Sequence, residues 1–372
     1  ELRKMAASLV VFGFDGAGSE ASEHAKRMLR SGCLGTILFG RNVKSPDQVK
    51  RLCSSLKRFA QPGKVLVMTD QEGGRVARLS VKENFTEIPS ARRVAACPGG
   101  ANAVAGIAKV MATELKAVNI DMTLAPVVDV DSNPKNPVIG DRAYSSDFQR
   151  VGALGSAFIA AVQGEGVATC AKHFPGHGDT VQDSHDVMPV IKHSRERLLE
   201  REVPPFRAAI ASGVASVIVG HLMVPALQDP GEVAQGIPAS MSRSILRFLR
   251  KDLAFEGVVM IDDIEMGAIA KRFSLREAVS ASLQGGVDLF LVCHKEESQV
   301  EVMDAICDAV RSGEVSMSRF KDAVANVRRL VDTYASAPLL NDKARLRIVG
   351  SHEHREIVKS ILAAAASSND DE

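Results

Sequence analysis

Short apolar runs alternate with longer amphipathic stretches along most of the chain. Each run is apolar nearly throughout, which is typical of strands in a parallel sheet that is buried on both faces. The eight predicted strands are Ser8–Phe14, Gly35–Phe39, Lys64–Met68, Asp121–Ala125, Val167–Cys170, Ala215–Val219, Gly257–Ile261 and Val287–Val292.

A helical period follows each of these strands. Apolar residues recur there every three to four positions, as they do on one face of an α-helix. Ser45 and Ser242 are placed to cap two of the helices at their N-termini. The predicted helices are Glu20–Ser31, Ser45–Ala60, Ala101–Val118, Asp147–Gln163, Arg195–Ser212, Ser242–Leu253, Leu275–Gln284 and Glu297–Arg311.

Eight βα units in succession predict an α/β fold, specifically a closed TIM-type (β/α)8 barrel, with a doubly wound open sheet as the structural alternative. We expect a single catalytic domain over residues 1–372, with the barrel at about residues 7–312. Two further helical stretches, Phe320–Ala335 and His354–Ala365, predict extra C-terminal helices at about residues 318–366 that pack outside the barrel.

Ionisable residues come directly after five of the predicted strands. In a barrel, the C-terminal ends of all strands meet at one rim, and barrel enzymes have their active sites at that rim. Segments far apart in the sequence would then converge, which favours the barrel over the open sheet. The residues concerned are Asp70, Arg142, Lys172–His185, His221 and Asp262.

Composition and charge argue against several classes of partner. The formal net charge is +1 and no long run of like charge occurs, so nothing favours binding to nucleic acid or to an anionic membrane. No apolar run reaches the length of about 18 residues that a membrane span needs. The six cysteines form no C-x-x-C pair, which predicts reduced, buried thiols and favours the cytoplasm. Residues 1–13 also mimic a short leader, although we favour a first strand there, and a removed export signal upstream stays open.

The stretch from Lys172 to Pro189, K-H-F-P-G-H-G-D-T-V-Q-D-S-H-D-V-M-P, holds three of the nine histidines. Neither a helical nor a strand period fits it, and Pro175 and Gly176 favour a loop. Loops rich in ionisable groups commonly carry function. We expect no metal, because the pattern lacks the helical H-E-x-x-H frame; the candidate zinc ligands would be His173, His177, Asp179 and His185.

Within this loop, Asp183 lies two residues before His185. A carboxylate beside an imidazole stabilises its charged form and fixes its tautomer, which leaves the other ring nitrogen to give or take a proton. An imidazole suits such work, because its unperturbed pKa is about 6.5. The alternative is a solvated turn with a local Asx hydrogen bond.

Asp262 and Asp263 end the predicted strand in V-V-M-I-D-D-I-E-M-G-A. A carboxylate at a strand end inside a barrel is costly unless it is paired or used. Successive residues point to opposite sides, so we expect only one of the two to face the pocket. The alternative is an N-cap for the turn that follows.

The segments K-H-F-P-G-H-G-D-T and D-S-H resemble the signature of family 3 glycoside hydrolases, in particular the bacterial β-N-acetylglucosaminidase (NagZ-type) branch. The segments D-Q-E-G-G-R-V-A-R-L, N-P-V-I-G-D-R-A-Y and I-D-D-I-E-M-G-A resemble the same family. In the last, Ile261 and Ile264 replace the usual Ser or Thr and the usual Leu, and Met266 sets the register. The resemblance covers about residues 8–295 and implies a barrel fold.

The resemblance also implies a role for each candidate residue. Asp262 is implied to be the nucleophile, and His185 the general acid/base with Asp183 as its partner. The residues implied to bind the sugar are Asp70, Arg78, Arg142, Lys172 and His173.

Other residues are implied to support the site. Glu72 and Arg75 brace a loop in which Gly73 and Gly74 allow a tight turn. His177 is a structural loop residue, and His221 lies near the pocket mouth. Asp129 and Asp131 resemble structural acids behind the fourth strand.

The implied activity is that of a retaining exo-β-N-acetylglucosaminidase, which removes terminal N-acetylglucosamine from peptidoglycan-derived muropeptides during cell-wall recycling. We expect a cytoplasmic monomer with a carbohydrate substrate and without a metal or an organic cofactor. With two tyrosines and no tryptophan, the chain would hold a sugar mainly by charged and hydrogen-bonding groups. The alternatives are an N-acetylglucosaminide phosphorylase with the same dyad and a non-catalytic muropeptide-binding protein.

Overall fold

The computed structural model describes residues 1–60, 63–180, 188–337 and 343–367. Its main sheet has eight parallel strands, which hydrogen-bond in the order β6-β3-β2-β1-β10-β9-β8-β7. These strands are β1 (Val10–Phe12), β2 (Gly35–Leu38), β3 (Leu66–Thr69), β6 (Met122–Thr123), β7 (Cys170–Phe174), β8 (Ser216–Val219), β9 (Val258–Ile261) and β10 (Leu289–Val292).

The two end strands of that order, β6 and β7, come together and close the sheet. Met122 bridges Ala168 and Val127 bridges Lys172, both in parallel pairing. The Ala168 N–H also donates to the Asp121 carbonyl at 2.8 Å. Since the strands follow one another round a closed ring in chain order, the predicted (β/α)8 barrel is confirmed and the open sheet is excluded.

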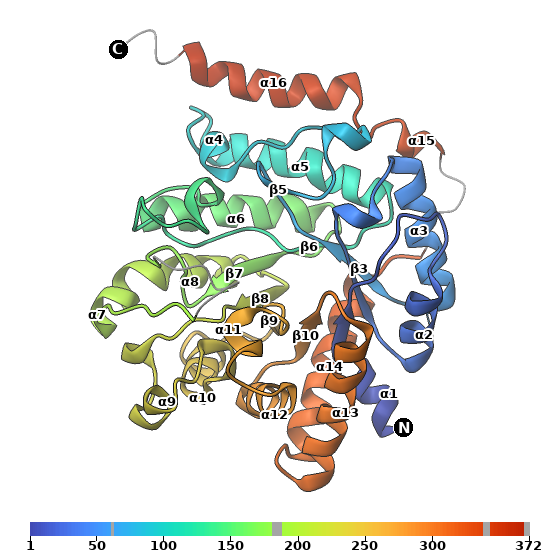
Figure 1. Ribbon diagram of the computed structural model, residues 1–372. Helices are drawn as coiled ribbons and strands as arrows, with labels where there is room; N and C mark the ends of the chain where they lie inside the picture. Colours follow the sequence, from blue (N-terminus) through green and yellow to red (C-terminus); the bar gives the residue numbers. More distant parts are fainter. Residues whose placement is uncertain (61–62, 181–187, 338–342, 368–372) are drawn as a thin grey trace.

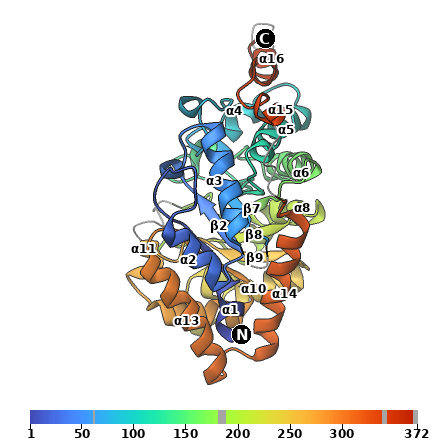
Figure 2. The ribbon, with the colours of Figure 1, turned by 90° about the vertical axis from the view of Figure 1, so that its right-hand side faces the viewer.

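Helices cover the outside of the barrel between successive strands (Figures 1 and 2). The predicted caps form, because the Ser45 and Ser242 side chains accept from the N–H groups of Gln48 and Ile245. The helices are α1 (Leu2–Ala7), α2 (Glu23–Ser31), α3 (Pro46–Phe59), α4 (Ala91–Ala95), α5 (Ala101–Ala117), α6 (Phe148–Gly164), α7 (Arg195–Arg197), α8 (Pro204–Ala211), α9 (Pro230–Ala234), α10 (Arg243–Arg247), α11 (Gly267–Ala270), α12 (Leu275–Gly285), α13 (Glu296–Ser312), α14 (Met317–Tyr334), α15 (Lys343–Leu346) and α16 (His352–Ser367).

One predicted helix, Arg195–Ser212, is interrupted by a π-helical turn at Leu198–Glu202. The Val203 N–H donates to the carbonyl five residues back at 3.0 Å. Pro204 follows and has no N–H, so the regular pattern of bonds to the fourth residue back cannot continue. The next predicted helix along the chain contains a second such turn, Phe248–Asp252.

The two ends of the chain add helices to the barrel. Helix α1 packs against α13, and β1 is shorter than the predicted strand Ser8–Phe14. At the other end, α14 packs against α12, and α16 lies along α5 on the outside, as predicted (Figure 1). The assignment of residues 1–372 to one catalytic domain stays a prediction.

A short hairpin follows β3 and carries part of the site. Its strands, β4 (Gln71–Gly73) and β5 (Val76–Ala77), pair antiparallel. Gly73 and Gly74 have φ angles of 101° and 57°, which favour glycine. A Cβ atom on Gly73 would come within 2.2 Å of the Pro89 carbonyl oxygen, so the predicted tight turn requires glycine.

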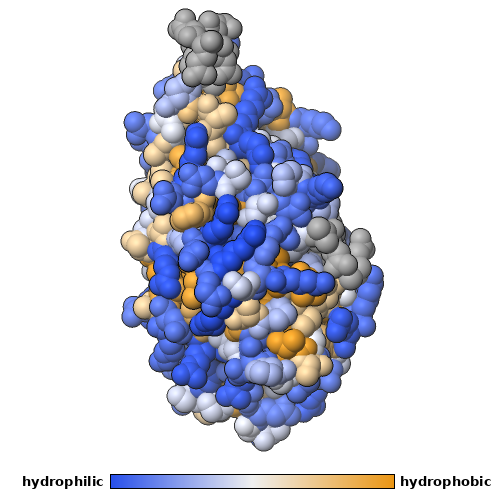
Figure 3. Space-filling view, turned by 90° about the vertical axis from the view of Figure 1, so that its left-hand side faces the viewer, coloured by the Kyte–Doolittle hydropathy of each residue, from blue (hydrophilic) through white to orange (hydrophobic). Residues whose placement is uncertain are grey.

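No helix in the described part of the chain has the length and apolar character needed to cross a membrane. The face shown in Figure 3 is mainly hydrophilic, with hydrophobic residues in small groups between charged ones. Scattered apolar residues of this kind are normal on protein surfaces.

Candidate active site

A cavity of about 300 Å³ opens at the C-terminal ends of the barrel strands. Apolar side chains from the barrel interior form part of its lining, and charged residues from several βα loops form the rest. Four of the predicted site residues line it, namely Asp70, Arg78, Lys172 and Asp262. The expected convergence of distant segments is therefore seen at this end of the barrel.

Asp262 lies immediately after β9, and its side chain borders the cavity. One carboxylate oxygen, Oδ1, accepts the Asp263 N–H at 3.0 Å. Burial raises the pKa of this carboxyl, but His173, Lys172 and the Asp263 N–H act against burial, and the pKa lies below its ordinary value. Asp262 is therefore an anion at neutral pH, as a carboxylate nucleophile must be.

Asp263 also borders the cavity, so the expectation that only one of the two acids would do so is wrong. The hydrogen-bond partners of its carboxylate differ from those of Asp262. Oδ1 accepts the N–H groups of Glu265 at 3.2 Å and Cys293 at 3.3 Å, and Oδ2 lies 3.3 Å from His294 Nε2. Asp263 thus caps the turn after β9 and ties it to β10, which fits the capping interpretation for this residue alone.

A network of charged side chains, largely buried except for the partly exposed Arg78, joins the hairpin to β7. Lys172 Nζ lies 2.9 Å from Asp70 Oδ1 and 2.7 Å from Glu72 Oε1. Arg142 donates through Nε and Nη2 to both oxygens of Glu72, each at 2.8 Å. Arg78 reaches the other oxygen of Asp70 at 3.2 Å. Two carboxylates thus face three cations, and every carboxylate oxygen has a cationic partner.

The network keeps its members charged. Burial raises the pKa of Glu72, but Lys172 and Arg142 outweigh it and lower that pKa to about 2. The pKa of Asp70 is likewise held below its ordinary value, because Lys172 and Arg78 outweigh the effect of burial. Burial lowers the pKa of Lys172, yet the two carboxylates raise it above its usual range. These charges are therefore fixed around neutral pH.

His173 and Arg142 lie next to each other behind this network. His173 Nδ1 is 2.8 Å from Asp129 Oδ2, and its Nε2 is 3.4 Å from Arg142 Nη2. Asp129 also accepts the backbone N–H of His177 at 2.7 Å. Burial raises the pKa of Asp129, but His173 and His177 outweigh this and lower it. Asp129 thus orients the start of the loop after β7, consistent with its expected structural role.

Asp183 and His185, the expected acid/base dyad, lie outside the described residues. On either side of them, Asp179 accepts a hydrogen bond from His193, and Arg197 approaches the same carboxylate oxygen at 3.4 Å. The two ends of the loop are thereby linked. Among the described residues, no group of three or more acidic, histidine or cysteine side chains could hold a metal ion.

Sequence reasoning underestimated Glu72 and missed the cavity wall made by Phe39 and His294. Glu72 is two residues from Asp70, so the period of an extended chain could have placed both side chains on one face. The Phe39 and His294 rings stack with centroids 5.7 Å apart. A hydrogen bond to Asp263 raises the pKa of His294. An aromatic ring thus lines the cavity beside the charged groups.

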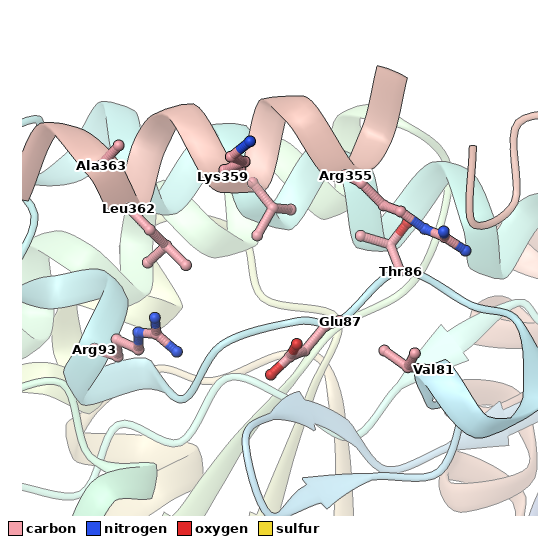
Figure 4. A pocket seen from close by; sticks show the side chains of 9 residues that line it. Val81, Thr86, Glu87, Arg93, Arg355, Lys359, Leu362 and Ala363 are labelled. Carbon is pink, nitrogen blue, oxygen red and sulfur yellow. The ribbon is translucent and has the colours of Figure 1, made fainter. Parts of the chain in front are cut away.

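Larger hollows lie away from the strand ends. One, of about 530 Å³, separates α16 from residues 81–93, and Figure 4 shows Leu362 pointing from the helix towards it. A second, of about 810 Å³, lies between α9 and α10, and a third, of about 440 Å³, lies between α1 and α14. None of the predicted site residues lines any of the three. The barrel cavity is therefore the candidate site.

A closed barrel with an ionised carboxylate and a charged network at the C-terminal ends of its strands is the arrangement of a (β/α)8-barrel enzyme. The family model described as "Glycosyl hydrolase family 3 N terminal domain" matches residues 2–330. The chain therefore belongs to glycosyl hydrolase family 3 and is a glycoside hydrolase.

The chain is similar to several named bacterial proteins. A "Beta-hexosaminidase" of Thiobacillus denitrificans is 36% identical over 296 residues, which are 78% of this chain and 79% of the relative. The structure of a family 3 β-N-acetylglucosaminidase from Paenibacillus sp. is 35% identical with a TM-score of 0.89, and covers 98% of this chain and 69% of that one. NagZ from Neisseria gonorrhoeae, in complex with N-trifluoroacetyl-D-glucosamine, is 27% identical with a TM-score of 0.75. The match covers 95% of this chain and 97% of that one.

Proposed function

We propose that this protein is a retaining exo-β-N-acetylglucosaminidase. The observation that carries the proposal is the ionised carboxylate of Asp262, which shares one cavity with the fixed charges of Asp70, Arg78 and Lys172. The names of the relatives support the choice of sugar, and the Neisseria structure holds an N-acylated glucosamine.

The proposed reaction takes place in two displacements. A terminal N-acetylglucosamine binds with its hydroxyl groups against Asp70, Arg78 and Lys172, with Arg142 and His173 completing the set. Asp262 attacks the anomeric carbon to form a glycosyl-aspartate, while His185, paired with Asp183, protonates the departing oxygen. His185, now neutral, then takes a proton from the water that attacks the intermediate. Two inversions give net retention.

We further propose that the substrates are muropeptides derived from peptidoglycan, and that the protein acts in the cytoplasm as a monomer. The expectation of a site without metal or organic cofactor is kept, because covalent catalysis by a carboxylate and an imidazole needs neither. The proposal of muropeptide substrates applies only if the enzyme accepts terminal N-acetylglucosamine.

An assay with paired chromogenic substrates tests the proposal. We expect hydrolysis of the aryl N-acetyl-β-glucosaminide at a kcat/KM at least about 10²-fold above that of the matching β-glucoside, because a polar site discriminates against a missing hydrogen-bonding group. Equal rates, or no turnover of either substrate, would contradict it. Analysis of the sugar product with and without inorganic phosphate separates hydrolysis from phosphorolysis.

Replacing His185 with alanine tests the acid/base role. We expect turnover of an unactivated disaccharide to fall by roughly 10²- to 10⁴-fold, because its leaving group requires a proton. With an aryl glycoside that has a good leaving group, the rate of the first displacement should fall far less. Rates are compared for both substrates in the wild type and the variant, and equal losses on the two would rule out general-acid catalysis by His185.

A further inference from the structure

His221 is buried next to the backbone that carries Asp262. The residue lies just beyond β8 and is only 1% exposed. Its Nε2 atom is 3.1 Å from the carbonyl oxygen of Asp262 and 3.1 Å from that of Asp263. Its Nδ1 atom is 2.8 Å from the hydroxyl oxygen of Ser240. Both ring nitrogens are therefore engaged, and Nε2 contacts two successive backbone carbonyls, that of Asp262 and that of Asp263.

These contacts determine which nitrogen bears the proton. A carbonyl oxygen only accepts, so Nε2 must carry the hydrogen and donate it to the two carbonyls. Burial lowers the pKa of His221, and the nearby carboxylates of Asp262 and Asp263 only partly oppose this effect. The ring is therefore neutral, and its unprotonated Nδ1 accepts from the Ser240 hydroxyl.

The position of these carbonyls matters because β9 ends at Ile261. Beyond that residue, the Asp262 N–H still donates to the Val219 carbonyl at 3.3 Å, a long bond. The Asp262 and Asp263 carbonyls receive the imidazole N–H at this point, and the Asp263 carbonyl also accepts the Met266 N–H at 3.0 Å. The imidazole thus adds a side-chain restraint at the end of the strand, beside the backbone bond from the Ile264 N–H to the Leu291 carbonyl at 3.1 Å.

We infer that His221 is a positioning residue, which sets the direction of the Asp262 side chain by holding the Asp262 carbonyl and that of the next residue, Asp263, through a single N–H donor braced by Ser240. The inference rests on the proposed function in that Asp262 is taken as the nucleophile. It assigns His221 no contact with the substrate.

Three variants separate the effect of the His221 N–H donor from the effect of side-chain packing. His221→Met fills a similar volume without a donor, whereas His221→Gln keeps an N–H group at about the position of Nε2. Ser240→Ala removes the brace and leaves the ring in place. His24→Met is the control, because His24 is a part-buried histidine that does not line the cavity and has its Nε2 atom 2.7 Å from Gln299 Oε1.

The expected result is a loss in kcat with binding preserved. For His221→Met on an aryl N-acetylglucosaminide, we expect kcat to fall about 10²-fold, because a shift of about 1 Å in a reacting group has this effect. The inhibition constant of N-acetylglucosamine should stay within about twofold, since the groups that bind the sugar are untouched. His221→Gln should recover most of the loss, Ser240→Ala should lose less, and His24→Met should match the wild type.

Amide hydrogen exchange gives a readout that does not need turnover. In His221→Met, the peptide covering residues 258–267 should exchange faster, while it should stay near wild type in His221→Gln. A folded His221→Met protein with unchanged kcat and exchange would overturn the inference, as would equal losses in the Met and Gln variants. A wild type that hydrolyses no N-acetylglucosaminide would refute the proposed function instead, and the exchange comparison would still decide the role of His221.

Discussion

Asp262→Asn is expected to lower kcat by roughly 10⁴-fold or more, because an amide cannot form the glycosyl-enzyme that divides the reaction into two easier steps. The substitution keeps the size of the side chain and the acceptor for the Asp263 N–H. It removes a negative charge that His173 and Lys172 now stabilise. The fold should therefore survive while the chemistry is lost. Steady-state rates on the aryl N-acetylglucosaminide measure the effect.

Asp263→Asn is the matched control for that change. Its carboxylate accepts two backbone N–H bonds, and an asparagine oxygen can accept the same bonds. We expect a loss of no more than about tenfold, since the group does not attack the sugar. Mass spectrometry after treatment with a slow fluorinated N-acetylglucosaminide should show one added glycosyl group on the wild type and on Asp263→Asn. Labelling of Asp262→Asn would reassign the nucleophile.

Glu72→Gln is expected to lower the free energy of unfolding by about 3–5 kcal/mol, because removing one partner of a buried ion pair leaves the others uncompensated. Glu72 is the only carboxylate paired with both Lys172 and Arg142 in the described network. Without its charge, Arg142 keeps one bond to the Val138 carbonyl at 3.1 Å and the long contact to His173. Urea denaturation at neutral pH measures the change.

Glu87→Gln controls for the loss of a glutamate on the same stretch of chain. Glu87 is exposed, and its substitution should change the free energy of unfolding by less than about 0.5 kcal/mol. A Glu72→Gln variant as stable as Glu87→Gln would show that the network contributes little.

The same pair of variants gives a prediction for pH. The pKa of Glu72 is about 2 in the folded protein, below its ordinary value of about 4.3 in an unfolded chain. Between these values the unfolded chain binds more protons, so the stability that Glu72 contributes is complete above about pH 5 and is lost as the pH falls towards 2. Glu72→Gln should therefore show a shallower fall over this window than the wild type. Parallel curves would contradict the prediction.

The sequence was sufficient to predict the barrel and most of its rim. Apolar runs separated by helical periods located seven of the eight strands, since strands buried on both faces are apolar nearly throughout. The fifth was misplaced: it was predicted at Val167–Cys170 but runs over Cys170–Phe174, so Lys172 and His173 lie in β7 and not in the loop expected there. The positions of Asp70, Lys172 and Asp262 just after such runs then predicted their convergence, because all parallel strands of a barrel end on one side.

Other features could not be predicted from local pattern. The π-helical turn at Leu198–Glu202 leaves the hydrophobic period intact, so the period alone reads as a continuous helix. The pairing of Arg142 with Glu72 joins residues 70 positions apart. The stacking of Phe39 on His294 joins the ends of β2 and β10, which neighbour β1 from either side. Such pairs depend on the closure of the sheet and have no signal in either segment alone.

By itself, the sequence determined the kind of fold, the end of the barrel that carries the chemistry, and the residues able to perform it, because burial and backbone period act on neighbouring residues. Only the tertiary structure decided how those residues are used. It assigned Asp263 to capping, made Glu72 the centre of the charge network, and placed the His221 N–H against the carbonyls of Asp262 and Asp263. These outcomes depend on distances of about 3 Å between segments that are far apart in the chain, and only the closed barrel sets such distances.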